Sequence, residues 1–166
     1  TPRGSQTARP PRAADLPARS WCCNAAYGLG DDGRMCTNGE EAGETGRAFG
    51  HGGETGDSDE LTALGTAGWE NVVANPATGD RTVVVGQSDG GTQNVYVYSG
   101  TKQANGNPVE MAGLANGTRK SISVAVFPAE SGSVAFPSGP HSFALPPHGP
   151  AFARPGAGPW GPKPRD

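Results

Sequence analysis

Short apolar runs alternate with turns rich in Gly, Asn and Asp between Trp21 and about Phe127. Each run has about five residues, which is the usual length of a β-strand and too short for a stable helix. The 27 Gly and 16 Pro residues of the chain weaken helices further, and only 34% of its residues are hydrophobic. This alternation predicts an all-β fold and argues against a helical bundle.

A hairpin is predicted within the stretch "GTAGWENVVANPATGDRTVVVG", residues 65–86. Residues 70–74 and 82–86 form its strands. Pro76 presets the turn between them, and Gly79 with Asp80 tolerates a positive φ. Trp69 at the start of the first strand is expected to be buried, so the carboxylate of Glu70 beside it needs either solvent or a partner.

Two further strands follow in the sequence. "NVYVY", residues 94–98, alternates strictly, so its two Val residues face one side and its two Tyr residues the other. "SISVAVF", residues 121–127, places Ile122, Val124 and Val126 on a common face. Strands so few and so short give a small sheet with exposed edges, which fits one blade of a β-propeller better than a complete domain. We therefore predict a partial β-propeller of one to two blades, although no internal repeat is evident.

Both ends of the chain differ from this middle region. Residues 1–20 are Pro, Arg, Ala and Ser without periodicity and are predicted to be disordered. Residues 128–166 contain a proline every few positions, so we expect an extended and mostly unstructured tail. Its abrupt start suggests a shifted reading frame or an appended segment, and a proline-rich ligand is the functional alternative.

Charge and composition argue against several classes of partner. The formal net charge is −3, and aromatic residues with adjacent basic patches are missing, which argues against nucleic acid. The sequence has no run of 18 apolar residues that would span a membrane, and its start does not form a complete signal peptide. The three cysteines, Cys22, Cys23 and Cys36, have no zinc-like spacing and are interpreted as incidental thiols.

Acidic residues are the main candidates for chemistry. Glu40, Glu41 and Glu44 lie close together in a Gly-rich segment, followed by Glu70 and then by Asp89 after "TVVVG". Calcium prefers such oxygen ligands on pliable loops, whereas the alternative is that these residues are solvated turn formers. His51 is interpreted as a polar residue at a strand end and not as a ligand or general base. EF-hand, HExxH, P-loop and GxSxG motifs are absent.

Three ordered stretches, "NGEEAGETGRAFGH", "GWENVVANPATGDRTVVVGQSDGG" and "NVYVYSGTKQANGNPVEMAGLANGT", resemble the secreted PhoX-type alkaline phosphatases and their bacterial relatives of unassigned function. The similarity covers residues 21–127 and is strongest over residues 38–118. It implies a β-propeller and a phosphomonoesterase activity that depends on iron and calcium ions held by carboxylates and a cysteine. It also implies a secreted or periplasmic location.

The resemblance assigns metal ligation to Glu40 and Glu41, which match a paired acidic motif, to Glu70, which opens the next blade, and to Asp89 after the "VVVG" strand. Gly39 stands where the phosphatases have a cysteine before the acidic pair, with Cys36 three positions earlier. This departure weakens an iron site more than a calcium site, because thiolate is a softer ligand.

Three hypotheses follow for function. The first is a hydrolase fragment in which cations promote the cleavage of phosphomonoesters. The second is a non-catalytic propeller segment whose acidic loops bind calcium. The third is a truncated or frame-shifted product without a stable fold.

Overall fold

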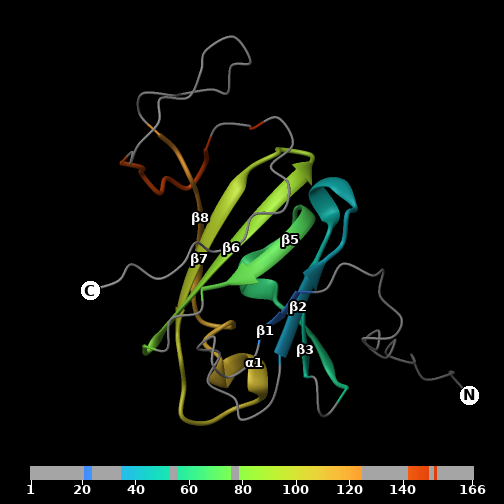
Figure 1. Cartoon of the computed structure of the whole chain (residues 1–166), viewed down its shortest axis with the longest axis vertical. Coiled ribbons are helices and arrows are strands. Elements are labelled where there is room, and N and C mark those ends of the chain that lie inside the picture. Colours follow the sequence, from blue (N-terminus) through green and yellow to red (C-terminus); the bar gives the residue numbers. More distant parts are fainter. Residues whose placement is uncertain are drawn as a thin grey trace, which may run out of the picture.

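The chain folds into two four-stranded antiparallel sheets that follow each other in sequence (Figure 1). The computed structural model describes residues 35–52, 56–75, 79–124, 142–149 and 152, and the backbone of Trp21–Cys23. The N-terminal sheet consists of β1 (Trp21–Cys23), β2 (Met35–Gly39), β3 (Ala48–Gly52) and β4 (Ser58–Glu60). The C-terminal sheet consists of β5 (Gly68–Ala74), β6 (Arg81–Gly90), β7 (Val95–Thr101) and β8 (Thr118–Ser121).

In each sheet the strands are ordered as in the sequence, from β1 to β4 and from β5 to β8. This order is the up-and-down meander of a propeller blade. The all-β prediction is therefore confirmed, and the two sheets fall within the predicted one to two units of short antiparallel strands. The predicted boundaries at residues 20 and 127 lie outside the described ranges.

The predicted hairpin is formed by β5 and β6, which pair from Ala74 with Val84 to Gly68 with Gly90. Its strand β6 is ten residues long and extends to Gly90, beyond the predicted end at Gly86. The predicted faces of β7 are also correct, because Tyr96 and Tyr98 are buried while the intervening Val97 is half-buried. Residues 76–78 of the turn lie outside the described part of the chain.

The last strand begins earlier than predicted. β8 starts at Thr118, which pairs with Ser99, and ends at Ser121, which pairs with Tyr96. The expected strand at 121–127 was placed on the apolar alternation, but the register with β7 selects the polar segment "TRKS" instead. Residues 125–127 are not described by the structure.

The two sheets meet through β2 and β5, which lie next to each other (Figure 1). The Thr37 hydroxyl of β2 donates a hydrogen bond to the carbonyl of Val72 in β5. The backbone amide of Trp69 likewise donates to the carbonyl of Glu40, at 3.0 Å. The junction therefore combines hydrogen bonds with apolar packing.

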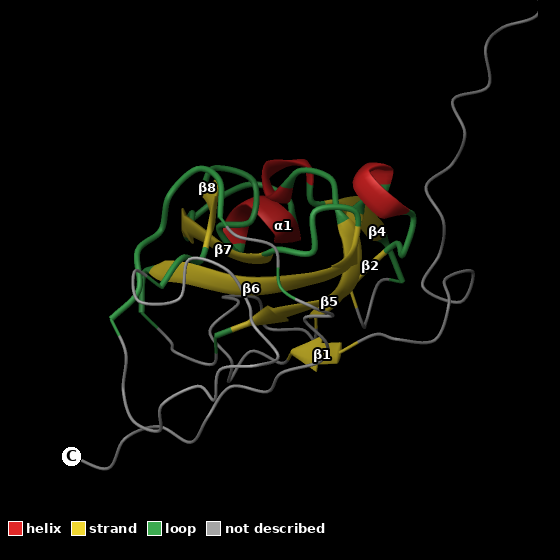
Figure 2. Ribbon diagram, turned by 90° about the horizontal axis from the view of Figure 1, so that it is seen from above, coloured by secondary structure: helices red, strands yellow, loops and turns green. Residues whose placement is uncertain are grey.

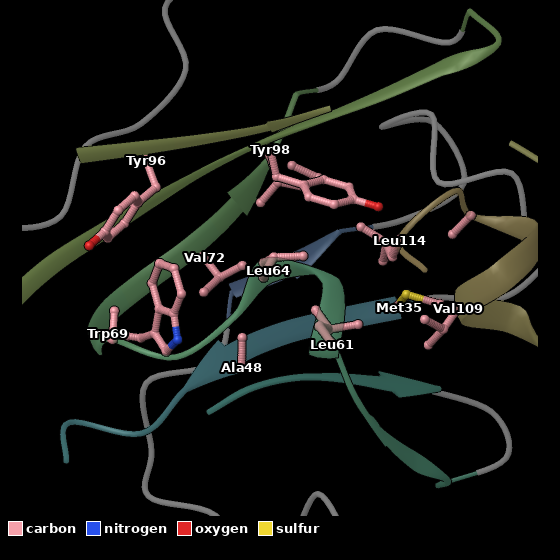
Figure 3. Packing of buried hydrophobic residues seen from close by; sticks show 14 residues of the cluster. Met35, Ala48, Leu61, Leu64, Trp69, Val72, Tyr96, Tyr98, Val109 and Leu114 are labelled. Carbon is pink, nitrogen blue, oxygen red and sulfur yellow. The ribbon is translucent and has the colours of Figure 1, made fainter. Parts of the chain in front are cut away.

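Trp69 lies at one end of a continuous apolar core, next to Tyr96, while Met35 and Val109 lie at the other end (Figure 3). The Trp69 side chain fills space that two glycines leave open. A β-carbon at Gly39 would collide with the Cβ and Cγ atoms of Trp69, and one at Gly86 with the far side of its indole ring. The core thus requires glycine at one position in each sheet.

Short helical elements cover one side of the layer formed by β5 and β6 (Figure 2). They are the 3-10 turns η3 (Gly43–Thr45) and η4 (Thr62–Leu64) and the single-turn helix α1 (Pro108–Met111). Asn107 caps α1 in a reciprocal capping box with Glu110. Residues that follow or belong to these turns complete the core, among them Leu64, Val109 and Leu114.

A piece of the proline-rich tail lies against β8. Ser123 and Ala144 form an isolated antiparallel bridge, and the amide of Ser121 donates to the carbonyl of Pro146 at 2.9 Å. The tail was expected to be extended and mostly unstructured, and no contact with the sheet was predicted. Within the parts that the structure describes, no helix is long and apolar enough to cross a membrane.

Candidate functional site

The three segments that carry the predicted ligands come together at one end of the two sheets. They are the turn after β2 with Glu40, Glu41 and Glu44, the start of β5 with Glu70, and the end of β6 with Asp89. Backbone contacts fix this arrangement. A β-carbon at Gly90 would lie 3.6 Å from the Cα atom of Gly43, and one at Gly68 would lie 3.3 Å from its carbonyl oxygen. We call this region the acidic end.

Glu70 occupies an irregular point of β5. Trp69 is paired with Ser88 and Asn71 with Gln87, so Glu70 is the extra residue of a β-bulge. Asp89 is the extra residue of a second register shift on the opposite strand, between the pairs of Gly68 and Trp69. Bulges re-aim side chains and are frequent next to functional sites. Glu70 and Asp89 are both half-buried.

Glu40 is engaged by an arginine. Arg47 donates to its carboxylate from Nη2 at 2.9 Å, from Nε at 3.1 Å and from its backbone amide at 3.1 Å. The hydrogen bond from the Arg47 side chain lowers the pKa of Glu40 below its ordinary value of 4.5. Arg47 also lies 3.7 Å from Glu60. Glu40 is therefore already engaged by a protein partner in this structure.

Glu44 was named among the acidic candidates in the sequence, whereas Asn71, next to Glu70 on β5, was missed. The carboxylate of Glu44 lies against Gly91, where a β-carbon would collide with it. Asn71 is 2% exposed, and neither its amide oxygen nor its amide nitrogen has a hydrogen-bond partner in the described part of the chain. An uncompensated buried amide is costly. Its signal in the sequence is an Asn inside the apolar strand "NVVA".

Metal-ligand groups of three or more His, Cys, Asp or Glu residues were not found among the residues described. The acidic end thus brings the segments of Glu40, Glu41, Glu70 and Asp89 together without gathering three such side chains around one point. Glu41 is exposed.

Cys36 is disulfide-bonded, so the interpretation of the cysteines as incidental thiols is wrong for this residue. A disulfide sulfur is not a thiolate, and Cys36 cannot serve as the soft ligand of an iron site in this state. The signal for the disulfide was present in the sequence as three cysteines within fifteen positions, Cys22 to Cys36.

His51 lies on β3, one residue from its end, as predicted for a structural polar residue. Its Nε2 atom is 2.7 Å from Asn38 Oδ1 and its Nδ1 atom 2.8 Å from Ser58 Oγ. Because an amide oxygen only accepts, Nε2 carries the proton and Nδ1 accepts from the serine hydroxyl. Burial lowers the pKa of His51 below 6.5, against the opposing charge of Asp59. The imidazole therefore joins three strands in its neutral form.

Comparison with known proteins does not add a family to these observations. A scan against protein families, a search of curated proteins and a search of solved structures each found no match. The likeness to PhoX-type phosphatases thus stays a prediction from the sequence.

Proposed function

We propose that the chain is a two-blade segment of a PhoX-type, calcium-dependent phosphomonoester hydrolase, with the acidic end as its cation site. The observation that supports this proposal is the meeting of three acid-bearing segments, the turn after β2 and both strands of the β5–β6 hairpin, at one end of the sheets, through the contacts of Gly43 with Gly68 and Gly90. Glu41 and Glu70 are 29 positions apart in the sequence and Glu70 and Asp89 are 19 apart, yet their segments converge there.

The donor set fits calcium better than iron. Glu41, Glu70 and Asp89 supply carboxylate oxygens, and the buried amide of Asn71 is a further oxygen donor of the kind that calcium takes. Glu40 would contribute only after exchanging its contact with Arg47. Iron is not part of the proposal, because the disulfide at Cys36 removes the nearby thiolate.

A bound calcium ion would polarise a phosphoryl oxygen and stabilise the negative charge that develops on the leaving group. The protein's own residues have a positioning role. The bulge at Glu70 presents its carboxylate at the strand start, and the backbone bond between Trp69 and Glu40 holds the adjoining turn in place. Arg47 carries a positive charge beside the acidic pair and would attract a phosphate dianion.

A second candidate function is calcium binding without catalysis. The engagement of Glu40 by Arg47 favours it, because one of the two paired acids is then missing from the ligand set. In this role calcium would lower the repulsion between neighbouring carboxylates and stabilise the junction of the two sheets.

Hydrolysis of p-nitrophenyl phosphate by the purified chain, in calcium and then in excess EGTA, tests the first candidate. We expect turnover that the chelator abolishes and that Glu70→Gln lowers at least about tenfold, as loss of a metal ligand does. Asp80→Asn is the matched control, because Asp80 is exposed and lies in the turn at the other end of the β5–β6 hairpin. Calcium-dependent amide protection around Glu70 without turnover would favour the second candidate, and the absence of both effects would refute both.

The disulfide at Cys36 supports the proposed secreted or periplasmic location, because disulfides persist in oxidising compartments.

A further inference from the structure

The edge of β8 is covered by an extended segment of the chain itself. The amide of Ser123 donates to the carbonyl of Ala144 at 3.0 Å, and the amide of Ala144 donates back to the carbonyl of Ser123 at 2.7 Å. The amide of Ser121 donates to Pro146 at 2.9 Å. The amide of Ile122, between them, donates in the opposite direction to Val95 of β7, at 2.8 Å. Residues 144–146 therefore extend the C-terminal sheet as a further strand would.

The attraction in this contact comes from the backbone. Phe143 is 58% exposed and Leu145 is 37% exposed, so the two large apolar side chains of the segment are not what holds it. Main-chain hydrogen bonds of this kind are the basis of peptide recognition by strand addition.

A close approach at Gly149 makes the contact selective. A β-carbon at this position would lie 2.6 Å from Ser121 Cβ, 2.7 Å from the carbonyl oxygen of Ile122 and 3.3 Å from Asn94 Oδ1. The first two distances are too short for any side chain without movement of the backbone. Glycine is thus required for the segment to lie this close to the edge.

The segment also reaches the turn beside the acidic end. The amide of Phe152 donates to the carbonyl of Gln93 at 2.9 Å. Gln93 has a φ of 52°, which a non-glycine residue adopts only when its surroundings hold it, and its side chain donates to the carbonyl of Asp89 at 3.4 Å.

We propose that the outer edge of β8 together with the turn at Gln93 is an acceptor site for an extended peptide, and that residues 142–149 and Phe152 occupy it in cis. The site recognises main-chain donors and acceptors opposite Ser121 and Ser123 and a glycine beside Ser121. It is independent of any metal chemistry at the acidic end.

Amide hydrogen exchange on the full chain tests the cis contact, because neighbouring amides of one strand serve as probe and control. In Gly149→Val the amides of Ser121 and Ser123 should exchange at least about tenfold faster, while that of Ile122 keeps its protection. Phe143→Ser is the control substitution and should change none of the three. Unchanged protection of Ser121 and Ser123 in Gly149→Val would overturn the proposal.

A peptide in trans tests the acceptor site itself. A labelled peptide with the sequence of residues 142–152, SFALPPHGPAF, should bind the Gly149→Val chain at least about tenfold more tightly than the unchanged chain, whose site is filled. The same peptide with Val in place of the glycine should bind neither. Equal binding to both chains, or binding to neither, would contradict the proposal. If Gly149→Val loses the protection of Ile122 and so unfolds, Ala144→Pro repeats both tests, because proline lacks the amide that donates to Ser123.

Discussion

The two sheets have the same strand order but are stabilised by different interactions. The N-terminal sheet buries polar side chains on three adjacent strands, with Asn38, His51 and Ser58 in one hydrogen-bonded chain. The C-terminal sheet buries aromatic and aliphatic side chains at alternating positions, as Tyr96 and Tyr98 illustrate, and buried polar side chains such as Thr82 and Ser88 bond there to backbone carbonyls and not to one another. One topology thus accommodates a chain of polar side chains in one sheet and an alternation of aromatic side chains in the other.

This difference predicts which changes destabilise each sheet. A polar interior is sensitive to the loss of one hydrogen-bond partner and to protonation, because the remaining groups are left buried and unsatisfied. An apolar interior is sensitive to changes in volume. Substitutions in the two sheets therefore test the comparison directly.

Trp69→Ala should have the largest effect. The side chain is 1% exposed and packs edge-on against Tyr96, with ring centroids 5.5 Å apart. We expect the free energy of unfolding to fall by about 3–5 kcal/mol, measured by urea denaturation with circular dichroism. Leu145→Ala, at an exposed position, is the control. A loss below about 1 kcal/mol would show that this core does not hold the C-terminal sheet.

His51→Phe tests the polar interior at nearly constant shape. It leaves Asn38 Oδ1 and the Ser58 hydroxyl without the ring nitrogens that lie 2.7 and 2.8 Å away. We expect a loss of about 2–3 kcal/mol in the free energy of unfolding, since buried unsatisfied groups are costly. A gain in stability would mean that an apolar side chain beside Phe49 stabilises this face of the sheet more than the hydrogen-bonded chain does.

Tyr98→Phe removes a buried hydroxyl from the apolar cluster and should cost less. The Tyr98 hydroxyl donates to the carbonyl of Gly113 at 2.9 Å and accepts from the amide of Gly117 at 2.8 Å. Its loss should lower the free energy of unfolding by about 1–2 kcal/mol. Amide exchange at Gly117 should rise in parallel, and protection that stays unchanged there would rule out this contribution.

Mild acid should produce the smallest effect, and only through the N-terminal sheet. The pKa of His51 is lowered by burial, so between that pKa and 6.5 the unfolded chain binds a proton that the folded chain does not. Stability should be constant above pH 6.5 and decrease as the pH falls below it. Urea midpoints at several pH values measure this, and His51→Phe should remove the decrease. A decrease of the same size in that variant would assign it to other groups.

The sequence was sufficient to predict the C-terminal sheet where side chains alternate. The alternation of Val97 and Tyr98 predicts the side of the strand on which each side chain lies, and Pro76 with Gly79 marks a turn. The same rule failed at β8, because an edge strand is selected by its register with β7 and not by the apolar residues that follow it. The bridge between Ala144 and Ser123 could not be predicted either, because main-chain hydrogen bonds leave no pattern of side chains in the sequence.

The N-terminal sheet and the site were harder to predict. His51 and Asn38 are buried polar residues that break the alternation on which strand prediction depends. The ligand assignment of Glu40 overlooked Arg47, seven positions later, because their contact exists only after β2 and β3 have paired. Such an acid and base on either side of a hairpin turn are a signal that sequence reasoning can use.

The fluorescence of the Trp69 indole depends on the contact between the two sheets. The indole lies between Gly39 of one sheet and Gly86 of the other, with the guanidinium of Arg119 located 5.7 Å from the ring. Separation of the sheets would expose it to water on the Gly39 side before the C-terminal sheet itself opened. In a chain with Trp21 and Trp160 replaced by Phe, its emission wavelength would then shift to the red ahead of the loss of β-structure and would report the order in which the two sheets unfold.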